Sequence, residues 1–259
     1  MAAFTGRSAA PVKLSTVPFP AVTLFIDLGD AEVVEARGGD GIRGSGVVGI
    51  GAAQLRVRAR HLECLQVRLS PTLAYAVLGE AVDDLAADTV GLDRIWGIEA
   101  ERLCNRVYEQ PDWDDRFAIV ESALAYRCLS ERRVDAEVTR AWHHLSARHG
   151  RIRVEQLADD VGWSRKRLWS RFRSQIGITP KRAAQLVRFD RAAHLLASGQ
   201  SAATVAAECG YTDQSHLNRD TTTLAGLTPG GVATARWLQA DPVAWPSSRS
   251  PAAPIATLD

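Results

Sequence analysis

The sequence lacks any apolar run of the roughly 18 residues that a membrane-spanning helix requires, and it lacks the charged start and apolar segment of a signal peptide. Its four cysteines are far apart in the chain and include no C-x-x-C pair, which excludes a zinc knuckle and a dithiol redox motif. They are Cys64, Cys104, Cys128 and Cys209. We therefore expect a cytoplasmic protein with buried thiols and no membrane contact.

The sequence also lacks residues arranged for catalysis or metal binding. Three aspartates around Trp113 are typical of the acidic start of a helix, where the helix dipole favours negative charge, rather than of catalytic carboxylates. Three histidines between positions 143 and 149 have no cysteine or carboxylate at ligand spacing. No nucleophile, base and orienting group can be combined. We therefore predict no enzyme activity, no catalytic residues, no metal site and no cofactor.

Gly44, Gly46 and Gly49 match the spacing G-x-G-x-x-G of dinucleotide sites. Such a site needs a strand before the first glycine and a helix opening at the third, because the helix N-terminus binds the pyrophosphate. Here a loop-like segment comes first and strand patterns follow, so the match does not predict a nucleotide site.

The net charge of the chain is small, but the charged residues are unevenly distributed. The whole chain of 259 residues has a net charge of only +1, which by itself indicates no polyanionic partner. Residues 141–238, however, contain 14 Lys and Arg against 7 Asp and Glu, a net charge of +7, which leaves a net charge of −6 for the remainder. This asymmetry indicates a basic module attached to an acidic one.

Strand patterns dominate the beginning of the chain. Residues 1–20 are rich in Ala, Ser and Pro, and we expect them to be irregular. Two β-branched apolar segments, residues 21–29 and 31–36, are separated by Gly29 and Asp30 and predict a hairpin. The alternation of apolar and polar residues in the segment that ends at Ser70 predicts further strands.

Helix patterns follow. Ser70 is placed to cap a helix that begins at Pro71 and stops at Gly79. Apolar spacing predicts two more helices, over residues 99–109 and 113–129. Strands followed by helices indicate an α+β domain.

Residues 156–180 and 204–229 repeat one pattern. In each copy a short helix is followed by a glycine, then by Trp163 or Tyr211, then by a cap, Ser164 or Thr212, and a second helix. The second copy has one extra residue in the turn. Two helix-turn-helix units are therefore predicted. The equivalent pairs are Gly162 and Gly210, Leu168 and Leu217, Gly177 and Gly226, and Pro180 and Pro229.

The second helix of the first copy contains the stretch "SRKRLWSRFR", with five basic residues and no acidic one. On a helix of 3.6 residues per turn, Leu168 and Phe172 define its buried side. The opposite side carries Lys166, Trp169, Ser170 and Arg173, with Arg165 beside them. Because the helix offers no acidic partner at i,i+4 spacing, its charge indicates an external acidic partner. The major groove of DNA admits one helix between two rows of phosphates.

These residues carry a family resemblance. The segments "LADDVGWSRKRLWSRFRSQIGITPKRAAQLVRFDRAAHLL", "VAAECGYTDQSHL" and "LAGLTP" resemble the two-helix-turn-helix DNA-binding domain of AraC-family transcriptional regulators. The resemblance covers residues 156–236, about a third of the chain, and implies a long helix from Pro180 to about Ala197, capped by Thr179, between the two units. The first half more loosely resembles the sensor domains attached to some members of this family.

The resemblance implies base-reading positions in both units. In the first unit they are the four residues that the helical projection selects, Lys166, Trp169, Ser170 and Arg173. In the second unit they are Ser215, Asn218, Arg219 and Thr222. Thr221 stands where the first unit has Phe172, so we expect a looser second unit. Residues 141–198 have a net charge of +8 and residues 199–238 of −1, so affinity should concentrate in the first unit.

The predicted architecture is an α+β N-terminal domain followed by an all-α C-terminal domain with two helix-turn-helix modules joined by a long helix. The predicted function is a sequence-specific transcriptional regulator that binds double-stranded DNA and responds to a small-molecule effector through its N-terminal domain. A homodimer through the N-terminal domain is also possible. The alternatives are a DNA-localised protein with a catalytic N-terminal half and a ligand-independent architectural DNA binder. The predicted segments are a sensor or assembly domain at 1–132, a linker at 133–140, the DNA-binding domain at 141–238 and an irregular tail at 239–259.

Overall fold

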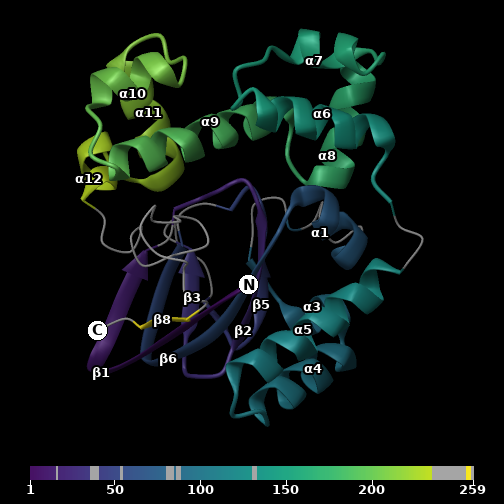
Figure 1. The fold of residues 1–259 in the computed structure, drawn as a ribbon, viewed down its shortest axis with the longest axis vertical. Coiled ribbons are helices and arrows are strands. Elements are labelled where there is room, and N and C mark those ends of the chain that lie inside the picture. Colours follow the sequence, from purple (N-terminus) through teal and green to yellow (C-terminus); the bar gives the residue numbers. More distant parts are fainter. Residues whose placement is uncertain are drawn as a thin grey trace.

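The computed structural model describes residues 1–15, 17–35, 41–52, 55–79, 85, 89–129, 133–234 and 255–257. The first half of the chain forms a curved, barrel-like sheet accompanied by helices, and residues 136–233 form helices. Figure 1 shows the sheet below and the helical part, α6 to α12, above it. The expectation of an N-terminal part with strands and helices followed by a helical C-terminal part is confirmed at this level.

The sheet is organised around one long strand, β6. The described strands follow the order β4-β3-β6-β2-β5-β7, while β1 pairs with β6, and β8 pairs with β1. Their bounds are β1 Ala2–Ser15, β2 Val22–Asp27, β3 Glu32–Glu35, β4 Ile42–Arg43, β5 Gly46–Val48, β6 Leu55–Leu69, β7 Thr89–Gly91 and β8 Ile255–Thr257. The strand pattern predicted between residues 55 and 69 is therefore a single strand that joins three others.

The predicted irregular start and the predicted hairpin are both wrong. β1 begins at Ala2 and runs antiparallel to β6. β2 and β3 do not pair with each other, because β2 pairs with the second half of β6 and β3 with its first half, both antiparallel. Gly29 and Asp30, which the sequence places in a hairpin turn, instead hold the junction of β2 and β3 against β6.

Close backbone packing explains this junction. A Cβ atom on Gly29 would lie 2.0 Å from the carbonyl oxygen of His61, so only glycine fits there. The Asp30 carboxylate accepts hydrogen bonds from the backbone N–H groups of Arg60 and His61, at 2.9 and 2.8 Å. Gly and Asp therefore serve a contact between segments about 30 residues apart in sequence, which their local turn signal does not reveal.

The helices of the N-terminal part follow their local signals. Ser70 accepts a hydrogen bond from the N–H of Leu73, Pro71 is the first helical residue, and Gly79 ends the helix, as predicted. The predicted helices at 99–109 and 113–129 are also present. The bounds are α1 Pro71–Leu78, α3 Leu92–Trp96, α4 Ile98–Tyr108 and α5 Trp113–Cys128.

The helical part is centred on α9, which the sequence places correctly. Thr179 caps it by accepting from the N–H of Arg182, Pro180 is its first residue, and it ends at Ala197. Phe189 is fully buried on its core side. Figure 1 shows the pairs α7–α8 and α10–α11 toward opposite ends of α9. The bounds are α6 Ala136–Ala147, α7 Val154–Asp160, α8 Arg165–Ile176, α9 Pro180–Ala197, α10 Ala202–Glu208, α11 Gln214–Ala225 and α12 Pro229–Ala233.

Two segments differ from the expected boundaries. α6 begins at Ala136, within the segment predicted as a linker at 133–140, and buries Val138 completely. β8 lies within the segment predicted as an irregular tail at 239–259, so that expectation does not hold for its three residues. The rest of the predicted tail lies outside the described residues.

The two halves share a core. One buried cluster runs from the sheet through Val77 of α1 to Phe172 of α8, and α1 contacts α8 directly. Farther along, Val17, which follows β1, packs in the same cluster as Phe189 of α9. The N-terminal part is therefore in contact with α8 and also with the connecting helix α9.

A charged contact accompanies the second of these junctions. The guanidinium carbon of Arg68, near the end of β6, lies 3.9 Å from the centroid of the Phe19 ring. Burial lowers the pKa of Arg68 to about 10, and the charge of Asp190 on α9 opposes this change. Burial likewise raises the pKa of Asp190, against the charges of His194 and Arg68. Opposite charges from the two halves thus face each other in a largely buried setting.

Two expectations from composition can be compared with the described residues. Cys209 is buried and Cys64 and Cys104 are partly buried, but Cys128 is exposed, so the expectation of buried thiols is wrong for that residue. No helix in the described ranges has both the length and the apolar composition needed to cross a membrane.

Candidate nucleic-acid interface

The helix α8 forms because its ends and its core side are well defined. Ser164 accepts a hydrogen bond from the N–H of Arg167 at 3.2 Å, as its predicted capping role requires. Gly177 ends the helix in the left-handed conformation. Leu168 and Phe172 are fully buried, and the ring centroid of Phe172 lies 6.4 Å from that of Trp142 on α6. One side of α8 is thereby anchored to α6.

The opposite side of α8 is open to solvent. We define the α8 face as Lys166, Trp169, Ser170 and Arg173, and all four residues are exposed. Trp169 is 46% exposed, an unusual position for so large a ring, and the guanidinium carbon of Arg173 lies 5.4 Å from its centroid. Arg165, predicted beside this face, is also exposed. The helical projection therefore selected exposed residues correctly.

The flanks of α8 do have acidic partners, contrary to the inference drawn from the helix alone. The Arg165 guanidinium lies 3.0 Å from the Glu155 carboxylate of α7. Arg171 is held by both carboxylate oxygens of Asp135, at 2.7 and 2.8 Å. Spacing within one helix could not reveal these pairs, because both acidic residues come from outside α8.

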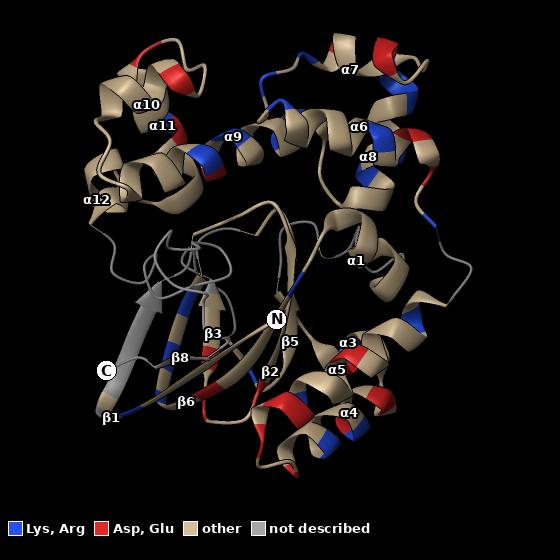
Figure 2. Ribbon diagram, viewed as in Figure 1, with Lys and Arg blue, Asp and Glu red and all other residues tan. Residues whose placement is uncertain are grey.

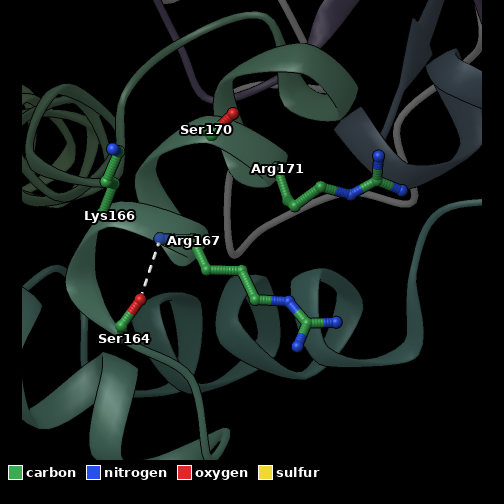
Figure 3. Close-up of a pocket in the computed structure, with 5 residues that line it drawn as sticks. All are labelled: Ser164, Lys166, Arg167, Ser170 and Arg171. Carbon is green, nitrogen blue, oxygen red and sulfur yellow. Dashed lines mark hydrogen bonds between the residues drawn. The ribbon is translucent and has the colours of Figure 1, made fainter.

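Figure 3 shows how the side chains leave one stretch of α8. Arg167 and Arg171 point to one side, and Lys166 points to another. The guanidinium carbon of Arg167 lies 4.4 Å from the Trp163 ring centroid, and Trp163 itself is nearly buried. A shallow depression of about 330 Å³ lies along this stretch and is lined only by polar and basic side chains. They are Ser164, Lys166, Arg167, Ser170 and Arg171.

The second unit repeats this arrangement with one difference at its cap. Gly162 and Gly210, equivalent in the repeat, both adopt φ of 72°, in the left-handed region where glycine is favoured. α11 is capped by Asp213, whose side chain accepts from the N–H of His216 at 2.7 Å. The expected cap, Thr212, is wrong by one residue. The extra residue of the second copy therefore lies in the turn, as predicted, and shifts the cap.

The predicted residues of α11 are also on its exposed side. Ser215, Asn218, Arg219 and Thr222 are all exposed. Thr221 is fully buried at the position equivalent to Phe172, and its hydroxyl donates to the carbonyl oxygen of Asn218 at 3.0 Å. α11 is thus anchored by a smaller side chain than α8.

The two candidate surfaces are separated by α9. Its 18 residues correspond to about 27 Å at 1.5 Å per residue. The α8 residues and the α11 residues therefore form two groups rather than one cluster. Figure 2 shows Lys and Arg on α8 and α9, and acidic residues around α10 and α11.

Two roles are open to the arginines of α9: contact with phosphates, or pairing with nearby acidic residues. Arg188 is paired: its guanidinium lies 3.4 Å from the Asp220 carboxylate of α11 and stacks 4.8 Å from the centroid of Tyr211. Tyr211 is buried and packs in the core of the second unit. Arg188 therefore joins α9 to the second unit.

The histidines before α7 form no metal cluster in the structure. His144 lies 3.2 Å from the Asp160 carboxylate, which also contacts Arg148 at 3.1 Å. Across the described ranges, no three His, Cys, Asp or Glu side chains gather in a way that could hold a metal ion.

The helical part is similar to a known family of helix-turn-helix domains. Residues 157–235 match a family described as "Helix-turn-helix domain". Over 66 residues the chain is 33% identical to "Uncharacterized HTH-type transcriptional regulator YbfI" of Bacillus subtilis (strain 168), a match that covers 26% of this chain and 24% of that protein. The chain thus spans about a quarter of the length of the curated relative that it matches.

Solved structures of ToxT from Vibrio cholerae share the fold over most of the chain. The structure titled as bound to unsaturated fatty acid has a TM-score of 0.50 at 10% identity, and covers 90% of this chain and 94% of that one. The structure titled as bound to (E)-4-(8-methylnaphthalen-1-yl)but-3-enoic acid has a TM-score of 0.50 at 12% identity, covering 89% and 97%. At this identity the likeness concerns the fold. The family match supports the resemblance predicted from the sequence: residues 157–235 form a helix-turn-helix domain of the AraC type.

Proposed function

We propose that this protein is a transcription regulator that binds specific DNA sequences through two helix-turn-helix modules, α7–α8 and α10–α11. The observation that carries the proposal is the α8 face, an exposed aromatic and cationic surface on a helix whose opposite side is fixed in the core. Arg can pair with the edge of guanine, and apolar side chains can contact the methyl group of thymine. Arg165 and Arg167, on the flanks, are placed for phosphates.

The first module supplies most of the binding energy in this proposal. Contacts with phosphate release counterions, so affinity follows the number of available cations. Residues 141–198 carry a net charge of +8, whereas residues 199–238 carry −1. The second module would then contribute to sequence recognition more than to affinity, because Asn218 can pair with the edge of adenine.

The N-terminal part is proposed to respond to a small-molecule effector. The two ToxT structures are bound to carboxylic acids, one of them an unsaturated fatty acid, which supports a similar capacity here. Two buried polar atoms, Gln66 Oε1 and Thr89 Oγ1, have no hydrogen-bond partner among the described residues. Pairing of β6, β2, β5 and β7 places them in adjacent rows of one sheet face. Because β2 and β5 lie between β6 and β7, a ligand at this face would need one polar group near each atom to satisfy both.

Selection from a pool of random DNA duplexes tests the DNA-binding proposal. We expect the wild-type chain to enrich one family of related sequences, because the α8 face offers directed contacts with base edges. A double variant, Lys166→Ala with Arg173→Ala, should enrich none. Equal retention of all duplexes by the wild-type chain would favour the architectural alternative and contradict the proposal.

Self-association through α5 is a further prediction of this proposal. Tyr126 and Leu129, three residues apart at the end of α5, are 78% and 80% exposed, an unusual exposure for large apolar side chains. We expect a homodimer at micromolar concentration, since paired half-sites match a two-fold symmetric protein. In analytical ultracentrifugation, Tyr126→Lys should shift the protein to monomer, and Tyr108→Lys, which alters a tyrosine 70% exposed on α4, should not.

A fragment containing only the helical part should be monomeric. It should begin at residue 133 rather than at Ala141, because α6 starts at Ala136 and buries Val138. A full-length protein that remains monomeric even on its selected DNA would remove the assembly role of the N-terminal part.

A further inference from the structure

Asp135 contacts the candidate recognition helix with both its side chain and its backbone. It occupies the N-cap position of α6, where an aspartate ordinarily accepts a hydrogen bond from the start of its own helix. Here the side chain makes no such bond. Its two carboxylate oxygens instead accept from Nε and Nη2 of Arg171, at 2.7 and 2.8 Å. Its backbone N–H donates to Oε1 of Gln175 at 2.9 Å.

The two partners of Asp135 are one turn apart on α8. Gln175 is almost completely buried, so its amide cannot swing away, and Arg171 meets the carboxylate with a planar two-bond geometry that fixes direction as well as distance. Three directed hydrogen bonds from one residue to two successive turns resist rotation of α8 about its own axis. The apolar contacts of Leu168 and Phe172 are less directional and leave this rotation softer.

The helix α8, which carries Arg171, also contacts the N-terminal part. α1 contacts α8, and Tyr75 of α1 is close enough to influence the ionisation of Arg171. The guanidinium beside Asp135 holds the pKa of that carboxyl below its ordinary value, so the pair is charged at neutral pH. Asp135 itself ends the connection from α5 and directly precedes the first residue of α6, Ala136.

The pair of Arg165 with Glu155 provides a useful contrast. It joins α8 to α7 by one contact at 3.0 Å, with both side chains more than half exposed. Such exposed pairs contribute little to structure. Each of the two acidic residues therefore neutralises one arginine of α8. Asp135 differs from Glu155 because it is also hydrogen-bonded to a buried residue, Gln175.

We propose that Asp135 is a positioning residue for sequence-specific DNA binding: by holding Arg171 and Gln175 it sets the rotation at which α8 presents its exposed face to the bases. This inference rests on the proposed function. Reading a base edge requires side chains held within a fraction of an ångström, whereas flexible Lys and Arg side chains still reach phosphates from a helix that has rotated. Loss of Asp135 should therefore reduce specific binding and spare non-specific binding.

The test compares Asp135→Ala with Glu155→Ala in the full-length protein. Each variant removes one negative charge and releases one arginine of α8, so both should steepen the salt dependence of binding to random duplex, by about 0.9 in the slope of log K against log salt. Only Asp135→Ala should lower the ratio of specific to random affinity, by 10-fold or more. Arg171→Ala should lower this ratio as well, and the double variant should lower it no further. Equal ratios for Asp135→Ala and Glu155→Ala would overturn the inference.

Hydrogen exchange in the free protein separates this inference from the proposed function. Asp135→Ala should speed exchange of the α8 amides at least 10-fold relative to the wild-type protein, and Glu155→Ala should leave them within about twofold of it. Asp135→Asn loses the negative charge but keeps a side-chain oxygen that can accept from Arg171, and should fall between the two. If the wild-type protein selects no DNA sequence, the proposed function fails. If α8 exchanges alike in the two alanine variants, the role of Asp135 fails whatever DNA is bound.

Discussion

Replacing Phe172 by alanine is expected to lower the free energy of unfolding of the helical part by about 3–5 kcal/mol. Phe172 is fully buried, its ring packs 6.4 Å from that of Trp142, and its cluster continues into α1. Removal of the ring loses apolar burial and leaves a cavity that the surrounding helices can only partly fill. Unfolding in urea followed by circular dichroism measures the loss. Ser170→Ala, an exposed change on the same helix, should alter stability by less than about 0.5 kcal/mol.

The equivalent position in the second unit provides the comparison. Thr221 is as fully buried as Phe172 but offers far less apolar area, so Thr221→Ala should cost less than Phe172→Ala. Thr221→Phe should be destabilising by about 1–3 kcal/mol, because the threonine is fully enclosed and a larger ring would overpack its site. A gain in stability from this substitution would show that the second unit has room which its complete burial does not indicate.

The helices of this protein were predictable because their signals are local. Ser70, Ser164 and Thr179 each cap a helix through the N–H group three residues ahead, as their sequence context indicates. The exposed side of α8 followed from the spacing of Leu168 and Phe172. One cap was wrong, since Thr212 and Asp213 are both capping residues and only the geometry of the longer turn selects Asp213.

The sheet was less predictable because its contacts are not local. β1 has no clear alternation of apolar and polar residues, and it is a strand because it pairs with β6, whose residues are distant in the sequence, from Ala2 with Gln66 to Ser15 with Arg56. Gly29 carries a turn signal, but the glycine is required by its approach to the His61 carbonyl. The ion pair of Asp135 with Arg171 spans 36 residues, so neither residue indicates the other. In each case the deciding interaction lies outside any window of sequence periodicity.

Alanine substitution of Arg173 is expected to weaken binding to the selected DNA by ~1–3 kcal/mol, which corresponds to a roughly 5- to 150-fold loss of affinity. The reason is its place on the α8 face, where a guanidinium can form two hydrogen bonds with one guanine. Fluorescence anisotropy titrations against the selected duplex, against every single-base variant of it and against a random duplex measure the effect. Arg106→Ala, which removes an exposed positive charge from α4, is the control and should bind all these duplexes as the wild-type protein does.

The pattern of loss distinguishes the two ways in which Arg173 can contact DNA. If Arg173 reads a base edge, the variant should stop discriminating at one base pair and keep its affinity for random DNA. If it contacts phosphate, binding should weaken evenly on all duplexes and the salt dependence should become shallower. Lys166→Ala is judged in the same way.

Asn218→Ala and Arg219→Ala should each weaken binding to the selected DNA less than Arg173→Ala does. The reason is that the second module has no net positive charge and that its recognition helix is anchored by Thr221, which is smaller than Phe172. The reverse ranking would mean that directed contacts of α11 outweigh the charge of α8, and unchanged affinity of both α8 variants on every duplex would remove α8 as the reading helix.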